Sequence, residues 1–202
     1  MEGKDTYKTI LEPSEEVLFK DKNSKFFGYA FPVSSADGVK VALSTIKEKH
    51  HKARHWCFAY QIGKETFSYR VNDDGEPSNS AGMPIYGQIQ SFDVTNIFVV
   101  VVRYFGGVKL GVGGLINAYK TTAQMSLEAS NIVENTINMH YSITFDYENM
   151  NIVMRKIKEY KLNIICQKLE LACEIIISIR KSESKKIFEI FDSIFKVKIK
   201  KA

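Results

Sequence analysis

Hydrophobic and polar residues in the first two thirds of the chain follow strand and helix periods in turn. Apolar residues at every second position predict strands, whereas apolar residues three or four positions apart predict helices. These rules predict a β-hairpin over residues 14–33, helices over 36–51, 81–92 and 114–131, and strands over 56–62, 67–71 and 96–105. The strand over 96–105 is a nearly unbroken apolar run, which indicates that both of its faces are covered.

A second set of elements follows from residue 136. The pattern predicts strands over 139–147, 162–169, 173–179 and 197–201 and helices over 150–160 and 184–195. Their order, β-α-β-β-α-β, is the ferredoxin-like plan. The joint over 132–137 is short and contains no Gly or Pro, so little free swing is expected there. We therefore predict an α+β fold in two domains, residues 1–135 and 136–202.

Length and composition narrow the class of protein. A chain of 202 residues with 45% hydrophobic and 25% charged residues is ordinary for one or two soluble domains. No apolar run reaches the length of a membrane span, and the first residues lack a signal-peptide pattern. The three cysteines, Cys57, Cys166 and Cys173, are odd in number and lack C-x-x-C spacing, which argues for a reducing compartment and against a zinc ribbon. A cytoplasmic protein without membrane contact is expected.

The positive charge is concentrated in the second domain. Residues 136–202 hold 13 Lys and Arg against 8 Asp and Glu, so the whole formal net charge of +5 lies there. A basic domain face can bind nucleic acid by releasing counterions from phosphates. The alternative is a solvated, lysine-rich surface that binds nothing, which explains the same excess of positive charge equally simply.

A glycine-rich segment joins the strand over 96–105 to the helix after it. Five glycines lie between Arg103 and Leu115, and Lys109 stands among them. Glycines at a strand-to-helix junction let backbone N–H groups approach an anion, and the helix dipole favours negative charge there. The segment matches neither G-x-x-x-x-G-K-[ST] nor G-x-G-x-x-G. The alternative is a tight packing corner that requires glycine for space alone.

The polar loop over 70–84 is the second candidate for chemistry. Its carboxylates, Asp73, Asp74 and Glu76, could bind a hard cation, serve as acid and base, or pair with Arg103 and Lys109. The calcium EF-hand spacing is absent. The alternative is a solvated acidic turn that caps the next helix.

Histidines and aromatic residues are weaker candidates. His50 and His51 are adjacent, so they cannot share one helix face, and no acidic partner stands at a metal-ligand spacing. His55, at a strand start, could contact phosphate or carry a proton, or simply bond to backbone at a corner. Tyr104 and Phe105 could stack bases or fill a core. No nucleophile–base arrangement is found, so no catalytic residue, metal or cofactor is expected.

Three motifs in order give a more specific indication. They are A-x-H-x-C-x-A-Y from Ala53, D-D-G-E-P-S-x-x-A-G-x-P from Asp73, and V-V-V-x-R-Y-F-G-G-x-x-L-G-x-G-G-L-x-x-A-Y from Val99. Over about residues 20 to 130 the chain resembles the YigZ/IMPACT family. The resemblance implies a first domain with the β-α-β fold of a small-subunit ribosomal protein and of elongation factor G, followed by a ferredoxin-like domain.

The resemblance also implies a function in binding. It implies a cytoplasmic regulator linked to translation or stress, with RNA, the ribosome, another polyanion or a protein as partner. The residues expected to contact the anion or nucleic acid are His55, Arg70, Asp73, Asp74, Glu76, Arg103, Gly106, Gly107, Lys109, Gly111, Gly113 and Gly114. The rival is an enzyme acting on a small phosphorylated or peptide-like substrate in a cleft between loops 71–84 and 105–114. Both hypotheses, the binding protein and the enzyme, predict that these two loops meet.

Overall fold

The computed structural model describes residues 5–170 and 172–202. They form two compact units, one made of Tyr7–Asn135 and the other mainly of Thr136–Ala202, to which Asp5 and Thr6 also belong. Each unit combines helices with an antiparallel sheet. The expected α+β class with two domains is confirmed.

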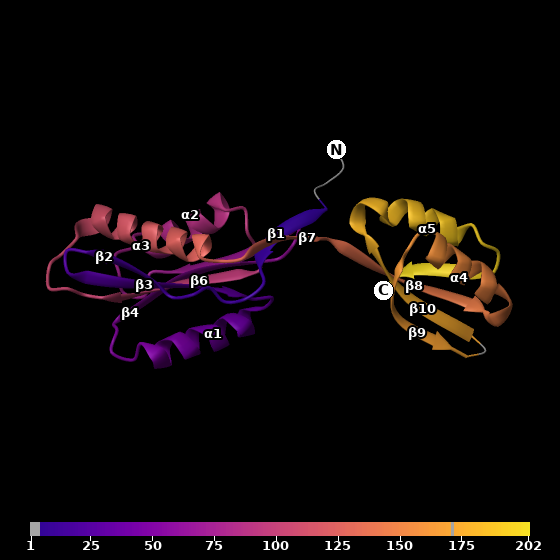
Figure 1. Cartoon of the computed structure of the whole chain (residues 1–202), viewed down its shortest axis with the longest axis horizontal. Coiled ribbons are helices and arrows are strands. Elements are labelled where there is room, and N and C mark those ends of the chain that lie inside the picture. The colour runs from indigo at the N-terminus through magenta and orange to yellow at the C-terminus, as the bar shows by residue number, and fades with distance from the viewer. Residues whose placement is uncertain (1–4, 171) are drawn as a thin grey trace. The chain divides into compact units, whose positions relative to one another are not determined.

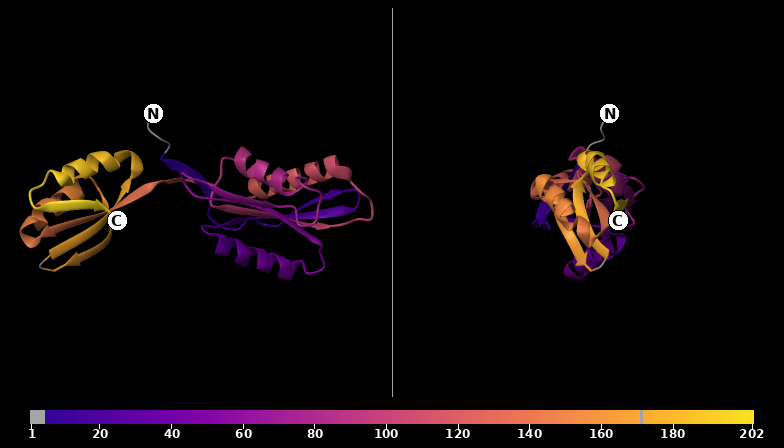
Figure 2. Two further views of the ribbon diagram at one scale, coloured as in Figure 1. Left: turned by 180° about the vertical axis from the view of Figure 1, so that it is seen from behind. Right: turned by 90° about the vertical axis from the view of Figure 1, so that its right-hand side faces the viewer.

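The first unit is built on a five-stranded antiparallel sheet (Figure 1). The strands in spatial order are β2 (Val17–Asp21), β3 (Ser24–Pro32), β6 (Ile97–Tyr104), β4 (His55–Ile62) and β5 (Ser68–Asn72). Helix α1 (Ala36–Lys49) covers one face, and helices α2 (Gly82–Ser91) and α3 (Gly111–Glu128) cover the other, as Figure 2 shows from behind. The central strand, β6, is thus enclosed between helices.

The valine run of β6 follows from this enclosure. Val99 and Val101 pack into the core under α2 and α3, whereas Val100 and Val102 pack into the core beneath α1. Successive side chains of a strand point to opposite faces, so a strand covered on both sides must be apolar throughout. The prediction that both faces of this strand are covered is confirmed.

Two strands were not predicted. β1 (Thr6–Ile10) and β7 (Ile132–Thr136) pair as a two-stranded sheet. The expectation that residues 132–137 form only a short joint is wrong, because most of them form β7. Five residues carry too little periodicity to indicate a strand, and the pairing partner lies at the other end of the domain's sequence.

Helix α3 also begins earlier than predicted, at Gly111 rather than at residue 114. Glycine is a poor helix former, so a pattern analysis starts the helix after the last glycine. The chain instead enters the helix through Gly111, whose φ is +75°. This conformation is easily reached only by glycine.

The second unit is a four-stranded antiparallel sheet with the order β11-β8-β10-β9. Its elements are β8 (Asn138–Asp146), the 3₁₀ turn Tyr147–Asn149, α4 (Met150–Glu159), β9 (Asn163–Leu169), β10 (Ala172–Arg180), the 3₁₀ turn Lys181–Glu183, α5 (Ser184–Asp192) and β11 (Val197–Lys201). This is the ferredoxin-like arrangement that the element order predicted. Ile175 and Ile177 of β10 pack with Val153 and Phe191 of the two helices in a core of the unit's own.

Asp5 is bonded to residues of this second unit. The Asp5 carboxylate accepts hydrogen bonds from Arg180 Nε at 2.6 Å and Nη2 at 3.1 Å, and the Asp5 carbonyl accepts from the Ile137 N–H at 2.6 Å. Bonding to Arg180 lowers the pKa of Asp5 to about 2. The charged form of this carboxylate therefore helps to hold Asp5 in place in the unit.

Candidate anion-binding site

The site begins with the alternation of side chains at the end of β6. Arg103 stands between Phe26 of β3 and His55 of β4 in the sheet register, and it points to the α2–α3 face. The next residue, Tyr104, points to the α1 face. Arg103 is 6% exposed although it lies one residue from the end of its strand. A buried guanidinium at this place requires a partner.

That partner is Glu76, from the loop between β5 and α2. Arg103 Nη1 donates to Glu76 Oε1 at 2.7 Å, and their side chains are 7% and 4% exposed. The Tyr119 hydroxyl of α3 donates to the same oxygen at 2.8 Å. Arg103 Nε is buried without a hydrogen-bond partner among the described residues. The 71–84 loop therefore meets the end of β6, as the complementary charges suggested.

A hollow of about 380 Å³ opens beside this ion pair. The residues that line it are Glu76, Pro77, Arg103, Phe105, Lys109, Leu110, Gly111, Val112 and Leu115. We call it the α3 pocket. The first turn of α3 has no acidic residue and no side-chain cap on its N–H groups. Glu76 and Arg103 neutralise one another, so Lys109 and the helix dipole leave the pocket positive.

The five glycines between Arg103 and Leu115 are subject to different structural constraints. A Cβ at Gly106 would lie 2.0 Å from the backbone carbon of Asn23, and one at Gly114 would lie 2.9 Å from the Cβ of Leu110. Gly107 and Gly111 have positive φ values of +87° and +75°. A Cβ at Gly113 would meet nothing within 4 Å. Packing thus explains two of the five glycines, and backbone conformation explains two more.

The two aspartates hold the shape of the 71–84 loop. Asp73 accepts from the N–H groups of Ala81 at 3.0 Å and Gly82 at 2.8 Å through Oδ1, and from Asn79 at 2.9 Å through Oδ2. Asp74 Oδ2 accepts from the Trp56 N–H at 2.7 Å. Asp73 therefore caps the start of α2, as the alternative interpretation of this loop expected. Neither carboxylate lines the α3 pocket.

His55 and Arg70 also stand apart from the pocket lining. His55 Nδ1 lies 2.9 Å from the carbonyl oxygen of Asp74. A carbonyl only accepts, so Nδ1 carries the proton and the ring is fixed to the loop backbone. Arg70 is exposed on β5. Of the predicted side chains, the structure brings together Glu76, Arg103 and Lys109.

Cys57 lies beneath the site, within hydrogen-bond distance of the Tyr119 hydroxyl at 3.2 Å and of the Asp73 carbonyl at 2.9 Å. Burial raises the pKa values of both the Cys57 thiol and the Tyr119 phenol. Both groups stay protonated near neutral pH, and Cys57 is a buried core residue. In residues 5–170 and 172–202, no three His, Cys, Asp or Glu side chains are gathered so as to hold a metal ion.

Four lining residues of the pocket were not predicted: Pro77, Leu110, Val112 and Leu115. Apolar residues next to a glycine loop are indistinguishable from ordinary core residues in a single sequence. Their only signal was adjacency to Glu76 and to the glycines of the loop. Among the described helices, none is both long and apolar enough to cross a membrane.

Comparison with known proteins places the chain in a family. The family model described as the Impact N-terminal domain matches residues 22–127, which include both loops of the site. An IMPACT family member of Haemophilus influenzae is 33% identical over 91% of this chain and 89% of its own length. The chain belongs to the IMPACT family. The resemblance inferred from the three motifs is confirmed.

Other members of the IMPACT family are similar to a comparable degree. YvyE of Bacillus subtilis is 33% identical and covers 76% of this chain and 70% of its own length. YigZ of Escherichia coli is 31% identical, with 66% and 67% covered. The crystal structure of a hypothetical protein matches 98% of both chains with a TM-score of 0.72 at 22% identity, which shows a shared fold alone.

Proposed function

We propose that this IMPACT-family chain is a regulatory binding protein linked to translation, and that its α3 pocket holds a phosphate of RNA or of another polyanion. The link to translation is taken from the family resemblance. The chemistry is taken from the pocket. The observation that carries the proposal is a buried, incompletely paired Arg103 beside an uncapped helix N-terminus.

The electrostatics of the pocket favour an anion over other guests. A helix N-terminus carries about half a positive charge and several unpaired N–H groups. Lys109 is exposed at the pocket rim and adds a full positive charge. The first turn of α3 has no acidic residue that would offset this charge. A phosphate oxygen can accept from these N–H groups at no cost in side-chain ordering.

The second unit supplies charge in a more diffuse way. Lys198 and Lys200 lie on the open face of its sheet, whereas Lys185 and Lys186 lie on α5. The positive charge is thus spread over both sides of the unit. Such a distribution supports non-specific attraction to phosphates, so the specific part of the proposal rests on the α3 pocket.

The test is the affinity for a fluorescently labelled single-stranded RNA, measured by anisotropy from low to moderate salt. Lys109→Ala removes one phosphate contact, so we expect its log–log salt slope to flatten by about 0.7 relative to wild type. Lys120→Ala is the matched control, because Lys120 is exposed on the same helix but does not line the pocket. Its slope should change less.

Two results would overturn parts of this proposal. If the wild-type protein does not bind RNA even at the lowest salt, the polyanion hypothesis is wrong. The hypothesis of an enzyme acting on a small substrate is then favoured. Equal effects of Lys109→Ala and Lys120→Ala keep polyanion binding but remove the α3 pocket from it. A double variant, Lys198→Glu with Lys200→Glu, then measures what the second unit contributes.

A further inference from the structure

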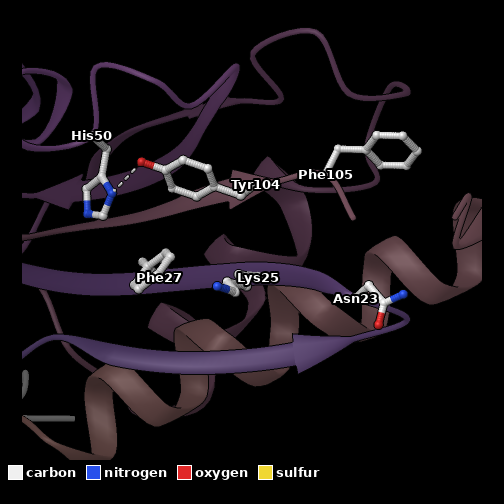
Figure 3. A pocket seen from close by; sticks show the side chains of 6 residues that line it. All are labelled: Asn23, Lys25, Phe27, His50, Tyr104 and Phe105. Carbon is white, nitrogen blue, oxygen red and sulfur yellow. Dashed lines mark hydrogen bonds between the residues drawn. The ribbon is translucent and has the colours of Figure 1, made fainter. Parts of the chain in front are cut away.

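A second hollow lies on the other side of the sheet, at the ends of β3 and β6 (Figure 3). It has a volume of about 460 Å³ and is lined by Asn23, Lys25, Phe27, His50, Tyr104 and Phe105. We call it the His50 pocket. Its volume is typical of pockets that hold small molecules. In the sequence, only Tyr104 and Phe105 pointed toward it, as residues that could stack bases.

Aromatic rings form much of its lining. Phe27 lies with its ring centroid 5.0 Å from that of His50 and 5.7 Å from that of Tyr104. Phe105, which is 54% exposed, adds a third ring to the lining beside Phe27 and Tyr104. Figure 3 shows the His50 ring and the Tyr104 hydroxyl pointing toward one another, with Phe27 beside His50. Such a lining suits a flat ring, which can stack on aromatic faces.

A chain of hydrogen bonds fixes the direction of the Tyr104 hydroxyl. The Tyr29 hydroxyl donates to the Glu16 carboxylate, which also accepts from Lys49 Nζ at 2.9 Å. The Tyr29 oxygen is then the acceptor for His50 Nε2 at 2.5 Å, so Nε2 carries the imidazole proton.

His50 Nδ1 consequently has no proton and accepts from the Tyr104 hydroxyl at 3.1 Å (Figure 3). A hydroxyl has one proton and two lone pairs. With its proton committed to His50, the Tyr104 oxygen is left to accept a hydrogen bond from a guest. A guest with an N–H group would satisfy it.

Charge sets the remaining requirement. Lys25 lies directly opposite Tyr104 in the register of β3 and β6 and is exposed at the pocket. None of the six lining residues is acidic. The pocket therefore repels cations and favours a guest that carries a negative group next to its ring. The aromatic faces suit a nucleobase, the Tyr104 oxygen suits an N–H group of that base, and the Lys25 ammonium group suits a phosphate.

We propose that the His50 pocket binds a nucleotide, with the base against the aromatic side chains, an N–H group of the base on the Tyr104 oxygen, and the phosphate on Lys25. This site is separate from the α3 pocket, which lies on the opposite face of the sheet and shares Phe105 with it. The nucleotide is either a free mononucleotide or one unit of single-stranded RNA. Both sources present the same groups.

The experiment is a titration of the ¹⁵N-labelled full-length protein, followed by NMR, with each of the four ribonucleoside 5′-monophosphates. We expect the amide signals of Lys25, Phe27 and Tyr104 to shift. Tyr104→Phe keeps the ring but removes the acceptor oxygen, and should weaken binding about 3- to 10-fold. Lys25→Ala should weaken the binding of nucleotides but leave the affinity for the corresponding nucleosides unchanged, because nucleosides lack the phosphate. Lys120→Ala is the charge-matched control and should bind as wild type.

A short single-stranded RNA separates the two sources. Binding much tighter than that of the mononucleotides, with the same sensitivity to Tyr104→Phe, identifies an RNA unit, whereas equal affinities identify a free nucleotide. The proposal is overturned if no mononucleotide or RNA shifts these signals, or if Tyr104→Phe and Lys25→Ala both bind as tightly as wild type. The spectra themselves report whether each variant is folded.

Discussion

Arg103 and Glu76 form a buried ion pair in which Nη1 and Oε1 are 2.7 Å apart and both side chains are less than a tenth exposed. The pair joins the central strand of the sheet to a loop 27 residues earlier in the chain. Tyr119 adds a hydrogen bond from α3 to the same carboxylate oxygen. One carboxylate thus connects β6, α3 and the loop before α2.

Removal of this carboxylate should be costly. Glu76→Ala leaves the Arg103 guanidinium buried without its counter-charge, and we expect the free energy of unfolding to fall by about 3–5 kcal/mol. Glu76→Gln should cost less, because an amide oxygen still accepts from Arg103 and Tyr119. Urea unfolding followed by circular dichroism measures both. A loss below about 1 kcal/mol for Glu76→Ala would show that the guanidinium finds another partner.

Two glycines of the same loop should respond in opposite directions to alanine. Gly106→Ala places a Cβ against the backbone of Asn23, so we expect a loss of stability of about 1–3 kcal/mol or more. Gly113→Ala adds a methyl group into open space inside a helix, where alanine is favoured by about 0.5–1 kcal/mol. Melting temperatures of the two variants test the pair. Destabilisation by Gly113→Ala would contradict the open space around this residue.

His50 should make the fold sensitive to mild acid. Burial is the main cause that lowers the pKa of His50, with Lys49 acting in the same direction and Glu16 against it. Below the unfolded-state pKa of about 6.5, the unfolded chain takes up a proton that the folded chain resists. The free energy of unfolding therefore falls as the pH drops through this range.

The control for this effect is His50→Gln. The glutamine amide can donate to Tyr29 and accept from Tyr104 but does not titrate. Denaturant unfolding at a series of pH values between about 7.5 and 5 should show a steeper decline for wild type than for His50→Gln. The contribution of Glu16, whose pKa is lowered chiefly by its hydrogen bond from Tyr29, belongs to a more acidic range. Parallel curves for the two proteins would contradict the prediction.

The sequence predicted the elements with a strong period and missed those without one. The apolar stripes of α4 and α5 and the valine run of β6 are long enough to identify their elements. β1 and β7 are short, and their pairing depends on residues more than a hundred positions apart in the chain. Such pairing is a tertiary property that local periodicity does not contain.

The site was predictable to a similar degree. Complementary charge indicated that Glu76 and Arg103 meet. It did not distinguish Glu76 from Asp73, whose carboxylate is used by the backbone of its own loop. Asp73 and Glu76 are only three positions apart in the loop. The path of the loop backbone decides which of the two carboxylates reaches β6. For the His50 pocket, the sequence suggested base stacking by Tyr104 and Phe105 but not the pocket itself, because its other residues come from β3, from the turn before it and from the end of α1.

The last residues of β6 impose a strict spacing on the protein. Arg103 lines the α3 pocket, Tyr104 lines the His50 pocket, and Phe105 lines both. A single residue inserted or deleted within β6 would turn every later side chain to the wrong face, placing the guanidinium under α1 and the phenol under α3. Both pockets therefore depend on the same alternation of side chains along β6, and a change in the length of this one strand would disrupt them together.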